Sequence, residues 1–223
     1  MTSARICRFA QPMPYAEAVA LQERLVRARI ADDIPDTLLL LQHPPTITLG
    51  RRGRREHLLT PPEQLKAHGI ALETSARGGD VTYHAPGQWV LYPILKLGPR
   101  EMGAHGYLHA LENIAIGTAK TFGVNAFRRD GMAGAWCPKG KFAAIGFKFT
   151  RWVTWHGLSL NVNPDLAGFD LIVGCGLVGE PVTSLKAVLH ENAPTMDATG
   201  DEIIRQAETV LARTLTAVSP NEL

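Results

Sequence analysis

The chain has 223 residues, a formal net charge of +2 and 45% hydrophobic residues, which is enough for one sizeable core. A charge so close to neutral gives no reason to expect a nucleic-acid-binding protein, and no apolar run approaches the ~18–20 residues that span a bilayer. Residues 1–14 lack the features of a signal peptide, and three widely spaced cysteines do not form a disulfide framework. We therefore expect a cytoplasmic protein, with a monomer as its simplest state, that binds neither membrane nor nucleic acid.

The first half of the chain predicts two helices and several extended segments. Apolar residues at helical spacing indicate a helix at 15–30. A short helix is expected at 61–68, where Thr60 and Glu63 form a capping-box pattern and Gly69 supplies a stop. Extended segments are expected at 37–42, 46–49, 70–74 and 88–95.

The second half predicts two further helices and two consecutive strands. These elements are expected at 108–122, 141–150, 154–162 and from 199 onward. Thr199 and Glu202 form a second capping-box pattern, which places the start of the last helix there. Helices and strands are mixed without regular alternation, and no linker divides the chain. We therefore predict a single α+β domain over residues 1–223.

Cys175 is the candidate nucleophile, because it lies between two glycines, Gly174 and Gly176. The absence of neighbouring side chains leaves backbone N–H groups free to point toward whatever the sulfur attacks. The thiolate is the reactive form, and a free cysteine has a pKa of about 8.5, so activation needs a positive neighbour or a dipole. The alternative is a small buried cysteine without a chemical role.

Lys141 is the candidate activator of that thiol. Strand alternation places it on the same face as four apolar residues, Ala143, Ile145, Phe147 and Phe149. A lysine on an apolar face loses its proton more readily than a free lysine, so it can exchange a proton with a thiol. The alternative is that Lys141, at the first position of its strand, extends to water.

Residues 77–88 read RGGDVTYHAPGQ, a pattern suited to close contact between backbone and ligand. Gly78 and Gly79 carry no side chain to block an approach, and Arg77 can bind a carbonyl or an anion. Backbone N–H groups of the glycine-rich Arg77–Gly79 segment, and those beside Cys175, are expected to stabilise an oxyanion. His84 is a candidate proton-transfer group, and the alternative for it is a hydrogen bond that stabilises the turn at Pro86-Gly87.

Two other clusters have weaker patterns. A metal site built from Cys137, Cys175, His84 and His156 would lack the close ligand spacing of zinc motifs, so no metal is expected. Four arginines form the only dense basic cluster, at Arg51, Arg52, Arg54 and Arg55. This cluster either steers an acidic partner toward the protein or is a solvated loop.

Several motifs, in this order, resemble those of the lipoyl(octanoyl) transferase family, the octanoyltransferases of lipoate biosynthesis. The matching segments are HPP at 43–45 with LGR at 49–51, RGGDVTYHAPGQ at 77–88, GAW at 134–136 with KFAAIG at 141–146, HGLSLNV at 156–162, DL at 165–166, Phe169, and CG at 175–176. The likeness covers about residues 40–180. Ala85 stands where the family pattern has glycine, and Gly174 where it has proline. Neither departure removes a reacting group, and we expect both to change pocket shape or loop rigidity.

The resemblance implies the fold of biotin and lipoate protein ligases, a mixed sheet flanked by helices, with a catalytic region over about residues 30–215. It implies that Cys175 is the acyl-thioester nucleophile and that Lys141 is its activating partner. The substrate-binding residues that it implies form three segments: Arg77, Gly78, Gly79, Asp80, Val81, Thr82, Tyr83 and His84; Ala144, Ile145 and Gly146; Gly157, Leu158 and Ser159.

The implied reaction moves an octanoyl group from octanoyl–acyl carrier protein to the target lysine of lipoyl domains, without a cofactor. The implied acceptors are the lipoyl domains of 2-oxoacid dehydrogenases and the glycine cleavage H protein. Three alternatives stay open: an ATP-dependent lipoate–protein ligase, an amidotransferase that moves octanoyl between carrier proteins, and a non-catalytic module that binds acyl carrier protein. The Cys175–Lys141 pair argues against the last.

Overall fold

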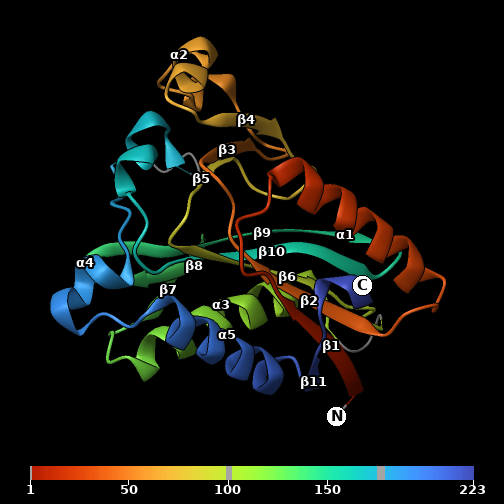
Figure 1. Cartoon of the computed structure of the whole chain (residues 1–223). Coiled ribbons are helices and arrows are strands. Elements are labelled where there is room, and N and C mark those ends of the chain that lie inside the picture. Colours follow the sequence, from red (N-terminus) through yellow and green to blue (C-terminus); the bar gives the residue numbers. More distant parts are fainter. Residues whose placement is uncertain (1, 99–101, 175–178) are drawn as a thin grey trace.

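The computed structural model describes residues 2–98, 102–174 and 179–223. Within these residues the largest element is a mixed eight-stranded sheet, shown edge-on in Figure 1. Its strands, in spatial order, are β11 (Arg213–Ala217), β1 (Thr2–Arg8), β2 (Asp36–Leu41), β6 (Gln88–Ile94), β10 (Val153–Asn161), β9 (Gly140–Thr150), β8 (Met132–Cys137) and β7 (Phe127–Arg129). The β1 strand pairs in parallel with β11 and β2, and the remaining pairs are antiparallel.

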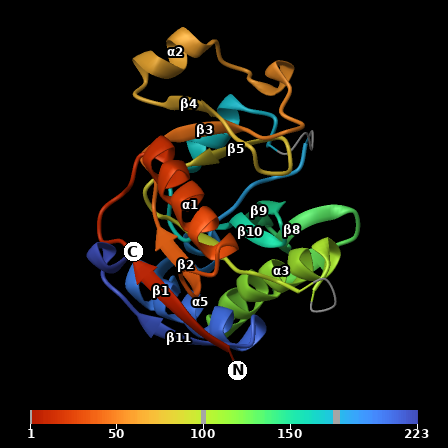
Figure 2. The same ribbon diagram turned by 90° about the vertical axis from the view of Figure 1, so that its right-hand side faces the viewer.

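Helices cover both faces of this sheet. The α3 (Ala104–Thr121) and α5 (Met196–Val210) helices lie side by side on one face, and α1 (Tyr15–Ile30) lies on the other (Figures 1 and 2). In β2, Leu38 and Leu40 pack in the α3–α5 core, while Leu39 and Leu41 pack in the α1 core. The unbroken leucine run of β2 follows from this position, since a strand buried on both faces needs apolar residues at every position.

A second, three-stranded sheet lies beyond the α1 face of the large sheet (Figure 1). Its strands are β4 (Ala71–Thr74), β3 (Thr46–Leu49) and β5 (Val81–His84), and α2 (Pro62–Ala67) packs beside them. The core of this sheet contains Ile47, Leu65, Val81, Tyr83 and Ile172. Short helices complete the described fold: α4 (Leu185–Leu189) and 3-10 turns at Arg55–His57, Leu166–Leu171, His190–Asn192 and Pro220–Glu222. No helix in the described part is long and apolar enough to cross a membrane.

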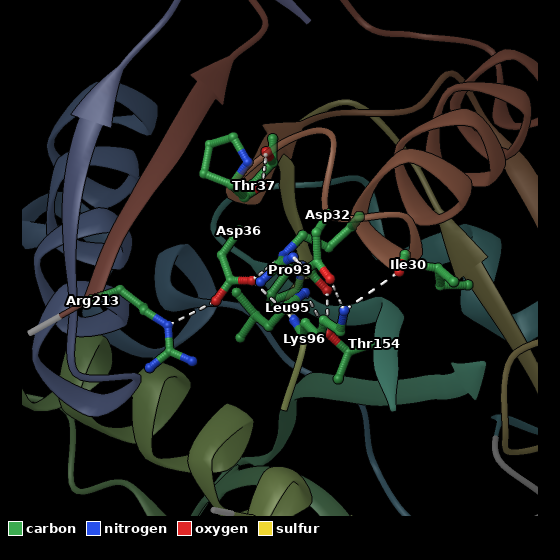
Figure 3. Close-up of polar contacts among 11 residues, drawn as sticks. Ile30, Asp32, Asp36, Thr37, Pro93, Leu95, Lys96, Thr154 and Arg213 are labelled. Atoms are coloured by element: carbon green, nitrogen blue, oxygen red, sulfur yellow. Dashed lines mark hydrogen bonds and ion pairs between the residues drawn. The ribbon is translucent and has the colours of Figure 1, made fainter. Parts of the chain in front are cut away.

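A buried ion pair between Asp36 of β2 and Arg213 of β11 lies near one edge of the large sheet (Figure 3). The Asp36 carboxylate accepts hydrogen bonds from Arg213 Nε at 2.8 Å, from Arg29 Nε at 2.7 Å and from the Lys96 backbone N–H at 2.9 Å. Asp36 and Arg213 are both buried. The contacts therefore connect β2 to β11, to α1 and to the end of β6, and they satisfy charges that would be costly to bury alone.

The structure confirms the predicted helix at 15–30 and the predicted strands at 46–49, 70–74 and 88–95 to within one residue at each end. Both capping boxes are wrong. The α2 helix follows Pro61 and has no side-chain cap, and α5 begins at Met196. Thr195 caps α5 by accepting a hydrogen bond from Ala198 N, whereas Thr199 lies inside the helix. The sequence did not predict β1, β5, β7, β8, β11 or α4.

Candidate functional site

A cavity of about 370 Å³ lies between the α1 face of the large sheet and the 77–84 segment. Thirteen of the sixteen predicted site residues line it: Arg77, Gly78, Gly79, Asp80, Thr82 and His84; Lys141; Ala144, Ile145 and Gly146; Gly157, Leu158 and Ser159. Val81 and Tyr83 do not, because strand alternation turns their side chains into the core of the small sheet. Cys175 lies outside the described residues.

Glycines bring two of the predicted segments into direct contact. Gly78 N donates a hydrogen bond to the Phe147 carbonyl over 2.9 Å. A Cβ atom at Gly146 would lie 2.8 Å from the Gly78 carbonyl oxygen and 3.0 Å from Arg77 Cδ. The 77–79 and 144–147 segments therefore form one continuous wall only because Gly146 lacks a side chain. The same hydrogen bond occupies the Gly78 N–H, so this group is not the oxyanion donor that the sequence suggested.

Replacing Gly146 by alanine is expected to lower kcat/KM of the reaction at this cavity about tenfold or more, since overpacking against a backbone carbonyl costs roughly 1–3 kcal/mol. The methyl group has to displace either Gly78 or β9, so the cavity wall moves. The measurement is the steady-state rate of each variant. Gly103→Ala is the matched control, because a Cβ atom at that position meets nothing within 4 Å. Equal rates for the two variants would contradict this account of the wall.

Arg77 anchors the cavity wall to β3. Its Nη2 donates to Thr48 O over 2.7 Å and to Thr48 Oγ1 over 2.8 Å, and Nη1 donates to Gly78 O over 3.1 Å. The side chain is buried and also lines the cavity. These contacts fix the shape of the glycine-rich segment, a role that the sequence did not indicate.

Lys141 lies at a β-bulge, and this changes the face on which its side chain falls. Ala143 pairs with Ala135, whereas Lys141 pairs with Trp136, so β9 has one extra residue between the two pairs. The predicted alternation is therefore wrong at Lys141: Phe142 joins Ala143 in the core, and Lys141 lines the cavity with Ala144 and Ser159. Its Nζ lies 5.5 Å from the centroid of the Trp136 ring, and only 7% of the residue is exposed. The alternative that Lys141 extends to water is thus wrong as well.

A second, smaller cavity of about 30 Å³ adjoins the first, and Lys141, Ala144 and Ser159 line both. Gly174, the residue that precedes Cys175 in the chain, lines the smaller cavity. Val173 N donates to His57 O over 2.8 Å, and Leu58 and Ile172 form an antiparallel bridge. Residues 172 and 173 are therefore fixed to the 57–58 segment, and Gly174 lines the same small cavity as Lys141.

Buried rings form one part of the lining of the larger cavity, called here its closed end. Tyr15, His84, Tyr92 and His156 line it, and each is at most 5% exposed. By contrast, Arg52, Gly131 and Ala133 line the exposed mouth. Tyr15 and Tyr92 carried no local sequence signal. They come from α1 and β6, which are distant in sequence, and only the fold brings them together.

The histidines at the closed end are held neutral by burial. Burial lowers the pKa of His84 well below its usual value and the pKa of His156 to about 3. His84 Nδ1 lies 2.6 Å from Gln88 Oε1, so a hydrogen bond spans the Pro86-Gly87 turn. The turn-stabilising alternative for His84 is therefore confirmed. An uncharged closed end suits an apolar ligand, because no ion has to lose its water when the ligand binds.

Asp80 holds the rim of the cavity. Its Oδ2 lies 2.5 Å from His57 Nδ1, and its Oδ1 accepts a hydrogen bond from Arg54 N over 3.2 Å. His57 also supplies the carbonyl that binds Val173, so Asp80 links the glycine-rich segment to the chain that leads to Cys175. These contacts make Asp80 a positioning residue in addition to one that lines the cavity.

Comparison with known proteins identifies the family. Residues 14–208 match the sequence model of the lipoyl protein ligase A/B catalytic domain. The octanoyltransferase of Syntrophotalea carbinolica is 51% identical to this chain over 79% of this chain and 80% of its own length. The octanoyltransferase of Geobacter metallireducens is 46% identical, with coverages of 83% and 84%.

Solved structures of low sequence identity confirm the predicted fold. A bipartite lipoate protein ligase from Thermoplasma acidophilum superimposes with a TM-score of 0.73 at 14% identity, covering 98% of this chain and 88% of its own. Lipoate-protein ligase A bound with ATP gives a TM-score of 0.74 at 14% identity, with coverages of 98% and 89%. Both the fold and the sequence comparisons agree with the resemblance of the motifs. The chain therefore belongs to the octanoyltransferases of the lipoyl protein ligase A/B catalytic domain family.

Proposed function

We propose that this octanoyltransferase takes the octanoyl group from octanoyl–acyl carrier protein and transfers it to the target lysine of a lipoyl domain through a thioester on Cys175. One observation carries the proposal. Lys141, a buried cation, lines the same small cavity as Gly174, the neighbour of Cys175, and also lines the larger cavity that suits an acyl chain. A positive neighbour is what a thiol needs to become a thiolate.

In the first step, the Cys175 thiolate attacks the thioester carbonyl carbon. The new C–S bond forms as the bond to the phosphopantetheine sulfur breaks, and Lys141 supplies the proton that the leaving thiolate takes up. In the second step, the amine of the acceptor lysine attacks the octanoyl–Cys175 thioester. An amide forms, the thiolate of Cys175 is released, and Lys141 accepts a proton from the amine. Exchange of one thioester for another is nearly balanced in energy, which suits covalent catalysis.

The larger cavity supplies the slot for the acyl chain in this proposal. Ser159, which lines the cavity together with Lys141, and His156, at the closed end, are three residues apart in β10. Three residues of a strand span roughly 10 Å. That length is on the scale of an extended eight-carbon chain. Burying seven aliphatic carbons contributes about 6 kcal/mol at ~0.8 kcal/mol per carbon, before the cost of ordering the chain.

The acceptors in the proposal are the lipoyl domains of 2-oxoacid dehydrogenases and the glycine cleavage H protein. We also propose that residues 1–223 form one catalytic domain. The pairing of β1 with β11 supports this, since it places strands from both ends of the chain in the same sheet.

The experiment that tests the proposal is a transfer assay with two arms. Octanoyl–acyl carrier protein and a lipoyl domain, without ATP, should give the octanoyl amide of the target lysine, and free octanoate with ATP should give none. Product in the ATP arm alone would instead identify a ligase. A separate assay with an octanoylated lipoyl domain as the donor covers the third alternative, because product in that assay alone would identify an amidotransferase. Binding of acyl carrier protein without product in any of these assays would identify a non-catalytic module.

A further inference from the structure

Four arginines lie in one short loop, and one of them, Arg52, lines the larger cavity, yet none has a role in the chemistry above. Arg51, Arg52, Arg54 and Arg55, called here the arginine loop, are all exposed. None of the ion pairs formed among the described residues includes one of these side chains. The loop therefore concentrates positive charge that the described part of the protein does not neutralise.

The backbone of the arginine loop is fixed to the cavity wall. Gly50 N donates to Asp80 O over 2.9 Å, Arg51 N to Arg77 O over 3.0 Å, and Arg52 N to Gly79 O over 3.0 Å. The carboxylate of Asp80 is already bound by Arg54 N and His57 Nδ1. These contacts hold the loop in register with the 77–80 segment, and the side chain of Arg52 lines the cavity itself.

This placement selects a particular kind of anion. A ligand that enters the cavity with its acyl chain toward the closed end has its thioester near Lys141, and whatever carries the thioester leaves through the mouth. A thioester has no carboxylate, so the acyl group itself offers no anion to the loop. The phosphopantetheine arm of the proposed donor does carry one, a phosphodiester. Guanidinium groups bind phosphate oxygens through paired, charge-assisted hydrogen bonds.

We propose that Arg52, supported by the other arginines of the loop, binds the phosphodiester of the phosphopantetheine arm that presents the acyl thioester. This inference rests on the proposed function, because it assumes that the donor is a thioester on such an arm. In this inference the arginine loop recognises the phosphopantetheine arm of the donor, and the closed end of the cavity recognises the donor's acyl chain.

The test measures binding without turnover, in full-length Cys175→Ala protein. The probes are octanoyl-4′-phosphopantetheine and octanoyl-pantetheine, which differ only in the phosphate. We expect the phosphorylated probe to bind about tenfold more tightly, the size of one charge-assisted hydrogen bond. Adding Arg52→Gln should remove that preference, and raising the salt concentration should weaken it. Arg27→Gln, which removes an exposed arginine on α1, is the matched control and should retain the preference.

Equal binding of the two probes, or a preference that survives Arg52→Gln, would overturn the inference. Octanoyl–acyl carrier protein and octanoyl-coenzyme A provide a second pair of probes. If Arg52→Gln weakens the binding of both to a similar extent, the result supports recognition of the phosphopantetheine arm. If it weakens the binding of the carrier protein alone, Arg52 contacts the surface of the carrier protein, and the phosphate assignment is overturned. Failure of the proposed function can be told apart from failure of this inference. It would appear as the absence of octanoyl transfer by the protein that retains Cys175, independently of how the two probes bind.

Discussion

Replacement of Cys175 by alanine is expected to abolish octanoyl transfer, with a loss of at least ~10⁴-fold, because removing a covalent nucleophile leaves only binding and oxyanion contributions. The other two cysteines are poor substitutes. Cys7 and Cys137 are buried, and burial raises the pKa of the Cys7 thiol to about 11, so that thiol stays protonated near neutral pH. The measurement is the rate of octanoyl-amide formation on a lipoyl domain.

The control for this prediction is Cys7→Ala, a change of the same chemical kind within the α1 core. It should cost some stability, since it leaves a small cavity, but should leave transfer within a few-fold of the unmodified protein. A Cys175→Ala protein that is folded and still turns over at a comparable rate would remove Cys175 from the mechanism.

Replacement of Lys141 by methionine is expected to slow the acylation step about 10²–10⁴-fold, the usual range for a proton-transfer group. Methionine fills most of the space that the lysine side chain occupies beside Trp136 and Gly134, but it has no proton to exchange. Without a positive neighbour, the Cys175 thiol should ionise nearer to the ~8.5 of a free cysteine. The acylation rate of the variant should therefore keep rising to a higher pH than that of the unmodified protein.

The measurement is the single-turnover acylation rate over a range of pH. Lys148→Met is the matched control, because Lys148 lies on the same strand with its Nζ 4.5 Å from the centroid of the Trp155 ring. It should leave the pH dependence unchanged. An acylation profile for Lys141→Met that coincides with the Lys148→Met profile in rate and in midpoint would show that Lys141 does not activate the thiol.

Much of the site was predictable because its residues lie in short segments with local signals. The paired glycines at Gly78 and Gly79 indicated close backbone contact, and the 144–146 segment ends in Gly146, whose missing side chain allows that contact. The order of the motifs along the chain indicated the fold, although β1, β5, β7, β8 and β11 were not predicted. β5 and β7 are only four and three residues long. β1 and β11 contain several polar residues, and they pair with each other across nearly the whole length of the chain.

Other features depended on geometry that no local pattern shows. An alternation rule assumes an uninterrupted strand, so it placed Lys141 on the wrong face when β9 contained a bulge. Thr195 and Thr199 both precede residues that suit the first turn of a helix, and only the structure shows that the helix begins at the earlier one. The closed end of the cavity combines Tyr15 with Tyr92, two buried residues that resemble ordinary core residues in the sequence.

The most direct test of the thioester mechanism is intact-protein mass spectrometry after incubation with octanoyl–acyl carrier protein in the absence of ATP and of any acceptor. The account predicts a single octanoyl adduct on the unmodified protein and none on Cys175→Ala. It also predicts that the adduct disappears when a lipoyl domain is added and is sensitive to hydroxylamine, as a thioester is. An unmodified protein that transfers octanoyl efficiently yet never carries the adduct, or an adduct that persists on Cys175→Ala, would contradict the account.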